Sequence, residues 1–300
     1  MDNSLVRRVW QVGEIVHDLA YFAPETRAAT GALGVRGGWM TYFGCRAAPL
    51  GAVSAAAVTA VFYNFAPEMV RRSVPDVWRY ATPEQLLHAR LAAMDAALRR
   101  VLAGPGAGRN GGTGSGLADD EALAAAAELA GRAAAAADVP GRPLAAANAA
   151  LPVPSAPHLA LWQALTTLRE HRGDGHVALL VSRGIGPVEA HVLAAASGRA
   201  TADGLRTHRQ WDDATWAAAE RALGDRGWLA ADGTLTPEGA RVREDLEEAT
   251  DALAAGPYAA LGAEGTERLL RLLRPLAERI VAAGAVPVPN PVGVPWPPPE

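Results

Sequence analysis

The sequence contains no lysine, and its only cysteine is Cys45. A single cysteine excludes an internal disulfide and any metal site made of cysteines alone, and it is typical of a reducing, cytoplasmic compartment. Without lysine the phosphate-binding pattern G-x-x-x-x-G-K-[ST] cannot exist, and no G-x-G-x-x-G follows a strand pattern. We therefore expect no nucleotide-dependent chemistry and no cofactor.

An excess of positive charge is also lacking. The 28 basic residues are outnumbered by 32 acidic ones, which gives a net charge of -4 and an isoelectric point near 6.0. Proteins that attract nucleic acid through their overall field are normally basic. The composition therefore disfavours DNA as a partner.

Uninterrupted apolar runs of membrane-spanning length are scarce. Residues 47–67 carry no charge, but Pro49, Gly51 and Pro67 lie among them. A membrane span needs about 20 mostly apolar residues. We predict a buried helix there and no membrane partner. The polar start Met1-Asp2-Asn3-Ser4 lacks the layout of a signal peptide, so a cytoplasmic location is expected.

Helical periodicity dominates the patterns that are present. Half of the residues are hydrophobic, and 300 residues suffice for a large core and two domains. The spacing predicts a mainly α protein with one short hairpin. Helices are expected at 6–20, 24–33, 37–47, 54–65, 83–102, 119–137, 158–172, 175–183, 212–225 and 264–283.

Glycine and proline mark the expected boundaries. Gly104 to Gly116 reads GPGAGRNGGTGSG, which predicts a flexible loop, and residues 287–300 are Pro-rich, which predicts an extended tail along the surface. The predicted divisions are an N-terminal helical domain (1–103), a flexible loop (104–118), an Ala-rich helix with a Pro-rich connection (119–155), a winged helix-turn-helix-like domain (156–284) and the tail (285–300).

The later half contains the signals of a winged helix. Asp212 can cap a helix that ends near Asp225, Asp232-Gly233 favours a tight hairpin, and Thr236-Pro237 can begin the next helix. The segment Gly227 to Gly239 resembles the wing and following helix of MarR-like winged-helix proteins. This resemblance implies that residues 212–225 form the recognition helix of a DNA-binding module.

The charges of that helix disfavour DNA. It carries four acidic residues and one arginine, Arg221, whereas a helix that reads the major groove needs Arg, Lys, Asn or Gln toward the bases. Arg206, His208, Arg209 and Arg226, just outside it, could still touch the DNA backbone. Gly38 to Gly51, together with Arg169 to His176, resembles an actinobacterial helix-turn-helix-like family without an assigned activity.

The run from Arg169 to His176 gathers two arginines, two carboxylates and two histidines around two glycines. One interpretation is structural: Gly173 ends a helix and Asp174 caps the next one. The other is chemical: His171 or His176 acts as a general acid or base, oriented by Glu170 or Asp174. The two histidines are five residues apart and share no helix face, so even with His158 we expect no metal site.

A second cluster is aromatic. Trp39, Tyr42, Phe43 and Arg46 fall three and four residues apart, so they share one helix face. That face is either a core stripe or, because buried polar groups need partners, the polar wall of a mostly apolar pocket. The candidate ligand-binding residues are Arg46, Tyr42, Trp39, Asn64, Tyr63, His17, Tyr21, Arg169 and Arg172.

These observations favour a helix-turn-helix-like protein that binds a small molecule in a pocket between its two halves. Arg46, Tyr42 and Asn64 would come from one half, and residues 170–176 from the other. Two alternatives remain open: a ligand-responsive MarR-like transcriptional regulator, and an enzyme of specialised metabolism that uses His176 or His171 as acid or base. A homodimer is also left open.

Overall fold

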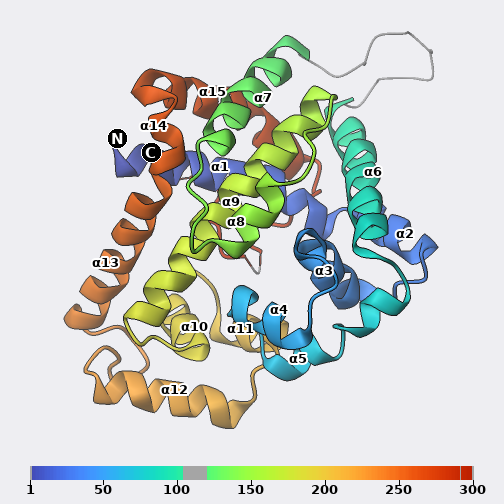
Figure 1. Cartoon of the computed structure of the whole chain (residues 1–300). Helices are drawn as coiled ribbons and strands as arrows, with labels where there is room; N and C mark the ends of the chain where they lie inside the picture. Colours follow the sequence, from blue (N-terminus) through green and yellow to red (C-terminus); the bar gives the residue numbers. More distant parts are fainter. Residues whose placement is uncertain (1, 104–119, 291, 299–300) are drawn as a thin grey trace.

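The computed structural model describes residues 2–103, 120–290 and 292–298, and it confirms a mainly α protein (Figure 1). Two short 3₁₀ turns, Ala48–Leu50 and Asp76–Arg79, accompany the α-helices. The α-helices are α1 (Asn3–Phe22), α2 (Pro24–Ala32), α3 (Gly37–Ala47), α4 (Ala55–Phe62), α5 (Pro67–Arg71), α6 (Pro83–Leu102), α7 (Asp120–Ala135), α8 (Pro143–Ala149), α9 (Pro157–Ser182), α10 (Pro187–Ala196), α11 (Ala202–Arg209), α12 (Asp213–Asp225), α13 (Pro237–Ala254), α14 (Gly256–Ala259) and α15 (Gly262–Ala282).

Local capping signals set the helix starts that the sequence predicts. The Thr82 hydroxyl oxygen accepts a hydrogen bond from the backbone N–H of Gln85, and the Gln85 side-chain oxygen accepts one from the backbone N–H of Thr82, so α6 begins with a capping box. Asp212 and Thr236 cap α12 and α13 in the expected way. The expected bounds of α3 and α6 are confirmed at both ends.

The predicted break at Gly173 is wrong, because α9 runs without interruption from Pro157 to Ser182. Gly173 is therefore not a left-handed helix end, and Asp174 caps no helix of its own. Instead, Asp174 Oδ2 accepts a hydrogen bond from the backbone N–H of Ala145, in the first turn of α8, at 2.9 Å. A carboxylate beside a helix N-terminus is favourable. The aspartate thus serves a neighbouring helix.

Helices α1 and α9 lie at the centre of the molecule (Figure 1). With α6, α7 and α15 they form the largest core, in which Ile15, Trp162 and Leu269 are fully buried. A second core contains residues of α3, α4, α5, α6 and α8. A third core packs the C-terminal end of α9 against α10, α11, α12 and α13. Elements from both predicted halves share the first core. The division into two halves itself stays a prediction.

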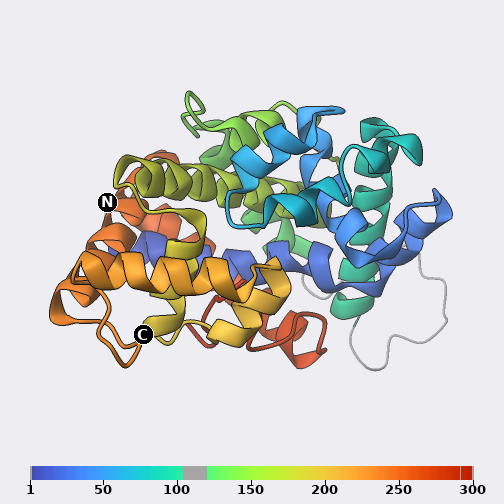
Figure 2. The same cartoon turned by 90° about the horizontal axis from the view of Figure 1, so that it is seen from below.

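Helices α10, α11 and α12 follow α9 as a helix-turn-helix-like series, and α12 lies along the outside of the molecule (Figure 2). The predicted two-stranded wing is wrong: the described residues contain no strand, and Leu229 and Leu235 form one isolated antiparallel bridge. Backbone bonds from Ala230 N–H to Thr234 O and from Thr236 N–H to Trp228 O close the turn. The hairpin is thus too short to count as two strands.

The structure tests only one of the two predictions made for the segments rich in glycine or proline. The predicted loop at 104–118 lies outside the described residues. The tail is not simply a surface segment, because Val286 and Val294 are buried. In the described part of the chain no single helix has the length and apolarity to cross a membrane; two bent pairs, 37–50 with 55–62 and 157–182 with 187–196, meet that test only by length and composition.

Candidate functional site

A cavity of about 420 Å³ lies where α1, α3, α9 and α11 meet. Its wall is mainly aromatic and aliphatic, and its charged side chains are three arginines. No carboxylate side chain lines it in the part of the chain that the structure describes. The lining residues are Tyr21, Phe22, Gly38, Trp39, Tyr42, Arg46, Val61, Asn64, Phe65, Leu144, Arg169, Gly173, His176, Val177, His208, Arg209 and Val292. We call this space the main cavity.

Two of the three arginines are held by buried carboxylates behind the wall. Arg46 Nε and Nη2 donate to the two oxygens of Glu170 at 2.8 and 2.9 Å. Arg169 donates from Nη1 to Glu170 at 3.0 Å and from Nε to Glu14 at 2.9 Å. Paired, planar bonds of this kind fix both position and orientation. The guanidinium groups therefore stand at the cavity in defined places.

The third arginine, Arg209, is the last residue of α11, and its guanidinium lies 4.5 Å from the centre of the Phe65 ring. Gln210 follows it in the left-handed conformation, with φ 57°. The Arg209 carbonyl accepts a hydrogen bond from the Ala66 N–H at 3.1 Å. The end of α11 is thus tied to the segment that carries Phe65.

The carboxylates behind the main cavity differ in ionisation. Glu14 and Glu170 pair with Arg169, and Glu170 also pairs with Arg46. Burial opposes ionisation of Glu170, but Arg46 and Arg169 outweigh it and lower its pKa, so this group is ionised. Burial and nearby Glu14 raise the pKa of Asp18 well above its usual value, which favours the neutral acid. Among the described residues that line the main cavity, the charged side chains are therefore arginines, two of which are backed by an ionised Glu170.

Asn64 carries a buried polar atom beside the main cavity. Its side-chain oxygen accepts no hydrogen bond from any residue that the structure describes, although Asn64 lines the main cavity. Its backbone carbonyl accepts bonds from His191 Nε2 at 2.8 Å and Trp211 Nε1 at 3.2 Å. Tyr63, before it, has φ 55°, and its hydroxyl donates to Ile185 O at 2.6 Å. Tyr63 thus keeps a costly backbone conformation next to Asn64, whose side chain lines the main cavity.

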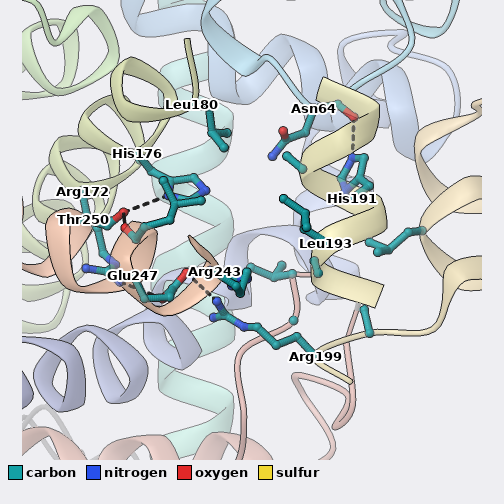
Figure 3. A pocket seen from close by; sticks show the side chains of 18 of the residues that line it. Asn64, Arg172, His176, Leu180, His191, Leu193, Arg199, Arg243, Glu247 and Thr250 are labelled. Carbon is teal, nitrogen blue, oxygen red and sulfur yellow. Dashed lines mark hydrogen bonds and ion pairs between the residues drawn. The ribbon is translucent and has the colours of Figure 1, made fainter. Parts of the chain in front are cut away.

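A second cavity of about 210 Å³ adjoins the first and shares His176, Arg169 and Arg209 with it. Figure 3 shows it between α10, which carries His191 and Leu193, and the α9–α13 pair. His176 Nδ1 and the Thr250 hydroxyl are 3.0 Å apart. Burial lowers the pKa of His176 to about 4, so its imidazole is neutral.

Glu247 organises the arginines of the second cavity. It accepts from Arg243 at 2.6 Å and Arg199 at 2.7 Å, and Arg172 lies 3.5 Å away (Figure 3). Burial raises the pKa of Glu247, but Arg199 and Arg243 outweigh it and bring this pKa to about 2. Arg172 also donates to Asp251 at 2.6 Å. This network ties α9 to α13.

The C-terminal tail completes both spaces. Val292 lines the main cavity and the second cavity, and Gly293 lines the second. Both cavities therefore depend on residues from the two ends of the chain, since Tyr21 and Trp10 come from α1.

A sequence model described as a helix-turn-helix family matches residues 6–287 of the chain. The chain belongs to this helix-turn-helix family. Comparison with curated proteins finds no match, and comparison with solved structures finds none either.

In this member of the helix-turn-helix family, the structure gathers most of the candidate residues around one space. Seven line the main cavity: Trp39, Tyr42, Arg46, Asn64, Tyr21, Arg169 and His176. His17 and Glu170 line a small adjoining pocket together with Tyr21, Tyr42 and Arg46. Arg172 lines the second cavity. Tyr63 supports Asn64 through its hydroxyl bond and lines none of these spaces.

His171 and Asp174, both offered as catalytic candidates, line neither cavity. Burial and Arg142 lower the pKa of His171 to about 4. Burial raises the pKa of Asp174 to about 6, although the hydrogen bond from the Ala145 N–H acts to lower this pKa. Their positions are those of groups that join α9 to α8 and its preceding loop. Among the described residues, no group of three His, Cys, Asp or Glu side chains could hold a metal ion.

The sequence alone did not indicate that Arg209 and Val292 line the main cavity. Arg209 stood as a candidate for the DNA backbone, because it lies next to the predicted recognition helix. Nothing local could have placed it beside Phe65, which is far away in the chain. Val292 follows a run of prolines that predicts only an extended tail.

Proposed function

We propose that this protein binds a small organic anion with an aromatic or apolar body in the main cavity. The observation that carries the proposal is the wall itself: three guanidinium groups from α3, α9 and α11 stand among aromatic side chains, with no carboxylate among the described lining residues. Arginine recognises planar anions through paired hydrogen bonds. A mostly apolar cavity with a few fixed polar groups is typical of ligand sites.

The cavity size and the oxygen of Asn64 narrow the ligand further. A space of about 420 Å³ accommodates a molecule of one or two rings. The buried Asn64 oxygen is costly to leave without a donor. The ligand should therefore carry an N–H or O–H group as well as negative charge.

The test combines ligand retention with a charge comparison. Native mass spectrometry of the protein from its own host should show a retained small molecule. In calorimetry, 4-aminobenzoate should bind at least about tenfold tighter than neutral 4-aminobenzamide, because both carry an amino donor for Asn64 and charge-assisted bonds are roughly twice as strong as neutral ones. Arg209→Met should remove this preference. Exposed Arg221→Met, on α12, should retain it. Equal affinity for the two compounds would contradict the proposal.

A ligand-responsive, MarR-like DNA-binding regulator is the second candidate. It is favoured by membership of a helix-turn-helix family and by the order of α10, α11, α12 and a tight hairpin. The charge of α12 disfavours this candidate, because three of the four exposed charged side chains of the helix are acidic: Asp213, Glu220 and Asp225, against Arg221. Its test is DNA affinity and the dependence of that affinity on salt.

The basic residues near α12 are engaged within the protein. Arg206 pairs with Asp213 at 2.7 Å, and Arg226 donates to the carbonyls of Gly184 and Arg183. Arg209 lines the main cavity. The Arg209 and Arg226 contacts support anion binding inside the protein rather than phosphate binding on its surface, whereas the Arg206–Asp213 pair is a surface pair.

A further inference from the structure

Arg90 of α6 is a buried cation whose charge is not matched by a bonded carboxylate. It is 6% exposed, and its one hydrogen bond among the described residues runs from Nη1 to the Cys45 carbonyl, at 3.1 Å. Its Nε is buried and donates to no described residue. The guanidinium lies 5.2 Å from the centre of the Trp162 ring, whose face attracts a cation but carries no opposite charge. Because arginine keeps its proton in proteins, this buried charge needs a counter-charge.

The acidic groups near Arg90 do not supply that counter-charge. Arg90 lines the small pocket beside the main cavity, and Glu170 is the one carboxylate among the described residues that line it. Both oxygens of Glu170 already accept bonds from Arg46, and one also accepts from Arg169. Burial raises the pKa of the Cys45 thiol to about 11, so the thiol is neutral. Burial lowers the pKa of Arg90, whereas at Arg46 the same burial is outweighed by Glu170 and the pKa is raised.

A second donor without an acceptor lies on the same pocket. Thr26 of α2 lines it and is 3% exposed, and its hydroxyl has no hydrogen-bond partner among the described residues. The neighbouring threonines are bonded: Thr30 donates to the Thr26 carbonyl at 2.9 Å, and the hydroxyl oxygens of Thr30 and Thr41 are 2.8 Å apart. A buried hydroxyl without a partner is costly. Thr26 and Arg90 thus each bring an unused donor to one small space, from helices that pack against each other.

We propose that the small pocket binds one monovalent anion of about the size of chloride, held by Arg90 and Thr26. The bound group must accept hydrogen bonds, because both unused groups are donors. It must also be negative, because a water molecule would satisfy the bonds and leave the charge of Arg90 uncompensated.

The size of the pocket limits the anion. Its volume of about 50 Å³ is less than the share of two water molecules in the liquid, about 30 Å³ each, so it holds one small ion and excludes an aromatic anion. Thr26 and Arg90 do not line the main cavity. The ion site is therefore separate from the ligand site proposed above. Because the bound ion joins α2 to α6 in the folded chain alone, its binding stabilises the fold.

The test is thermal unfolding at constant ionic strength, with chloride replacing gluconate, which is too large for the pocket. The melting temperature should rise by roughly 2–5 °C and then level off, as expected where chloride reaches about ten to a hundred times its dissociation constant. Arg90→Gln should abolish the rise. Arg99→Gln, an exposed position on the same helix, should retain it. Thr26→Val keeps the shape of the side chain and should raise the chloride concentration for the half-maximal effect about tenfold, because one bond to a charged group is lost.

Bromide in place of chloride locates the ion, because its anomalous scattering should give a peak between Arg90 and Thr26 in a crystal. A melting temperature independent of chloride would overturn the proposal and leave water as the only occupant. A chloride effect unchanged in Arg90→Gln and in Thr26→Val would place the ion elsewhere and overturn it too. Should Arg90→Gln not fold, as judged by circular dichroism, Thr26→Val and the bromide peak decide. Binding of 4-aminobenzoate in the main cavity is measured separately and does not depend on these outcomes.

Discussion

At the scale of single residues, Glu170 determines where the arginines of the main cavity stand. It is 1% exposed and accepts bonds from Arg46 and Arg169. A buried carboxylate loses its hydration, and the loss is offset only when its oxygens are fully bonded. Here three N–H groups supply those bonds. Glu170 is therefore a positioning residue behind the cavity wall.

We expect Glu170→Gln to lower the free energy of unfolding by about 3 kcal/mol, because removing one partner leaves buried guanidinium charge uncompensated. Glu244→Gln is the matched control. Glu244 also pairs with an arginine, Arg7 at 3.2 Å, but it is more than half exposed, and an exposed pair contributes about 0–1 kcal/mol. Urea unfolding at neutral pH measures both. Equal losses would show that the Glu170 pairs are as weak as surface pairs.

The residues on one helix face could be predicted from the sequence, but their partners could not. Spacing placed Trp39, Tyr42 and Arg46 together on α3, as the structure shows. The bond between Arg46 and Glu170 joins residues 124 positions apart. Periodicity reports the angle around one helix and carries no information on which helix packs opposite. Arg209 escaped assignment for the same reason.

At the scale of elements, α9 shows how tertiary packing overrides a local signal. Gly173 and Gly175 both disfavour a helix interior, and the sequence therefore predicted a break. The helix continues because α1, α7, α8 and α13 all pack against it. At Gly175 a Cβ would lie 2.5 Å from Arg142 Nη1, so the missing side chain makes room for that arginine. At Gly173 the nearest atoms would be 3.8 Å away.

Gly173→Ala should therefore stabilise the protein by about 0.5–1 kcal/mol, the usual gain for alanine over glycine inside a helix. Gly175→Ala is the comparison and should lose this gain, because Arg142 donates to the carbonyls of His171 and Leu253 and must move. Thermal unfolding of both variants measures the difference. A lower melting temperature for Gly173→Ala would support a left-handed Gly173 and contradict the continuous helix.

At the scale of the whole molecule, the lining of the main cavity and the exposed helix α12 differ in charge. Arginines from α3, α9 and α11 face the cavities, while the exposed helix α12 is acidic and the net charge is -4. The sequence predicted the acidic helix correctly because charges on a surface helix can be counted directly. It could not predict that Arg209 points inward, or that Val292 of the tail lines the same cavity.

This distribution predicts that the protein has no measurable affinity for duplex DNA at 0.15 M salt. Phosphate binding requires an array of cations on the contacting surface, and each neutralised phosphate adds to the salt dependence.

The double variant Asp213→Arg/Asp225→Arg changes two exposed acidic residues of α12 and leaves both cavities unchanged. If the acidic charge of α12 alone prevents DNA binding by the helix-turn-helix-like series, this variant should bind duplex DNA, and its affinity should fall steeply between about 0.05 and 0.2 M salt. Fluorescence anisotropy with labelled duplexes measures both proteins. Tight, salt-sensitive binding by the unaltered protein would contradict the prediction and favour the regulator.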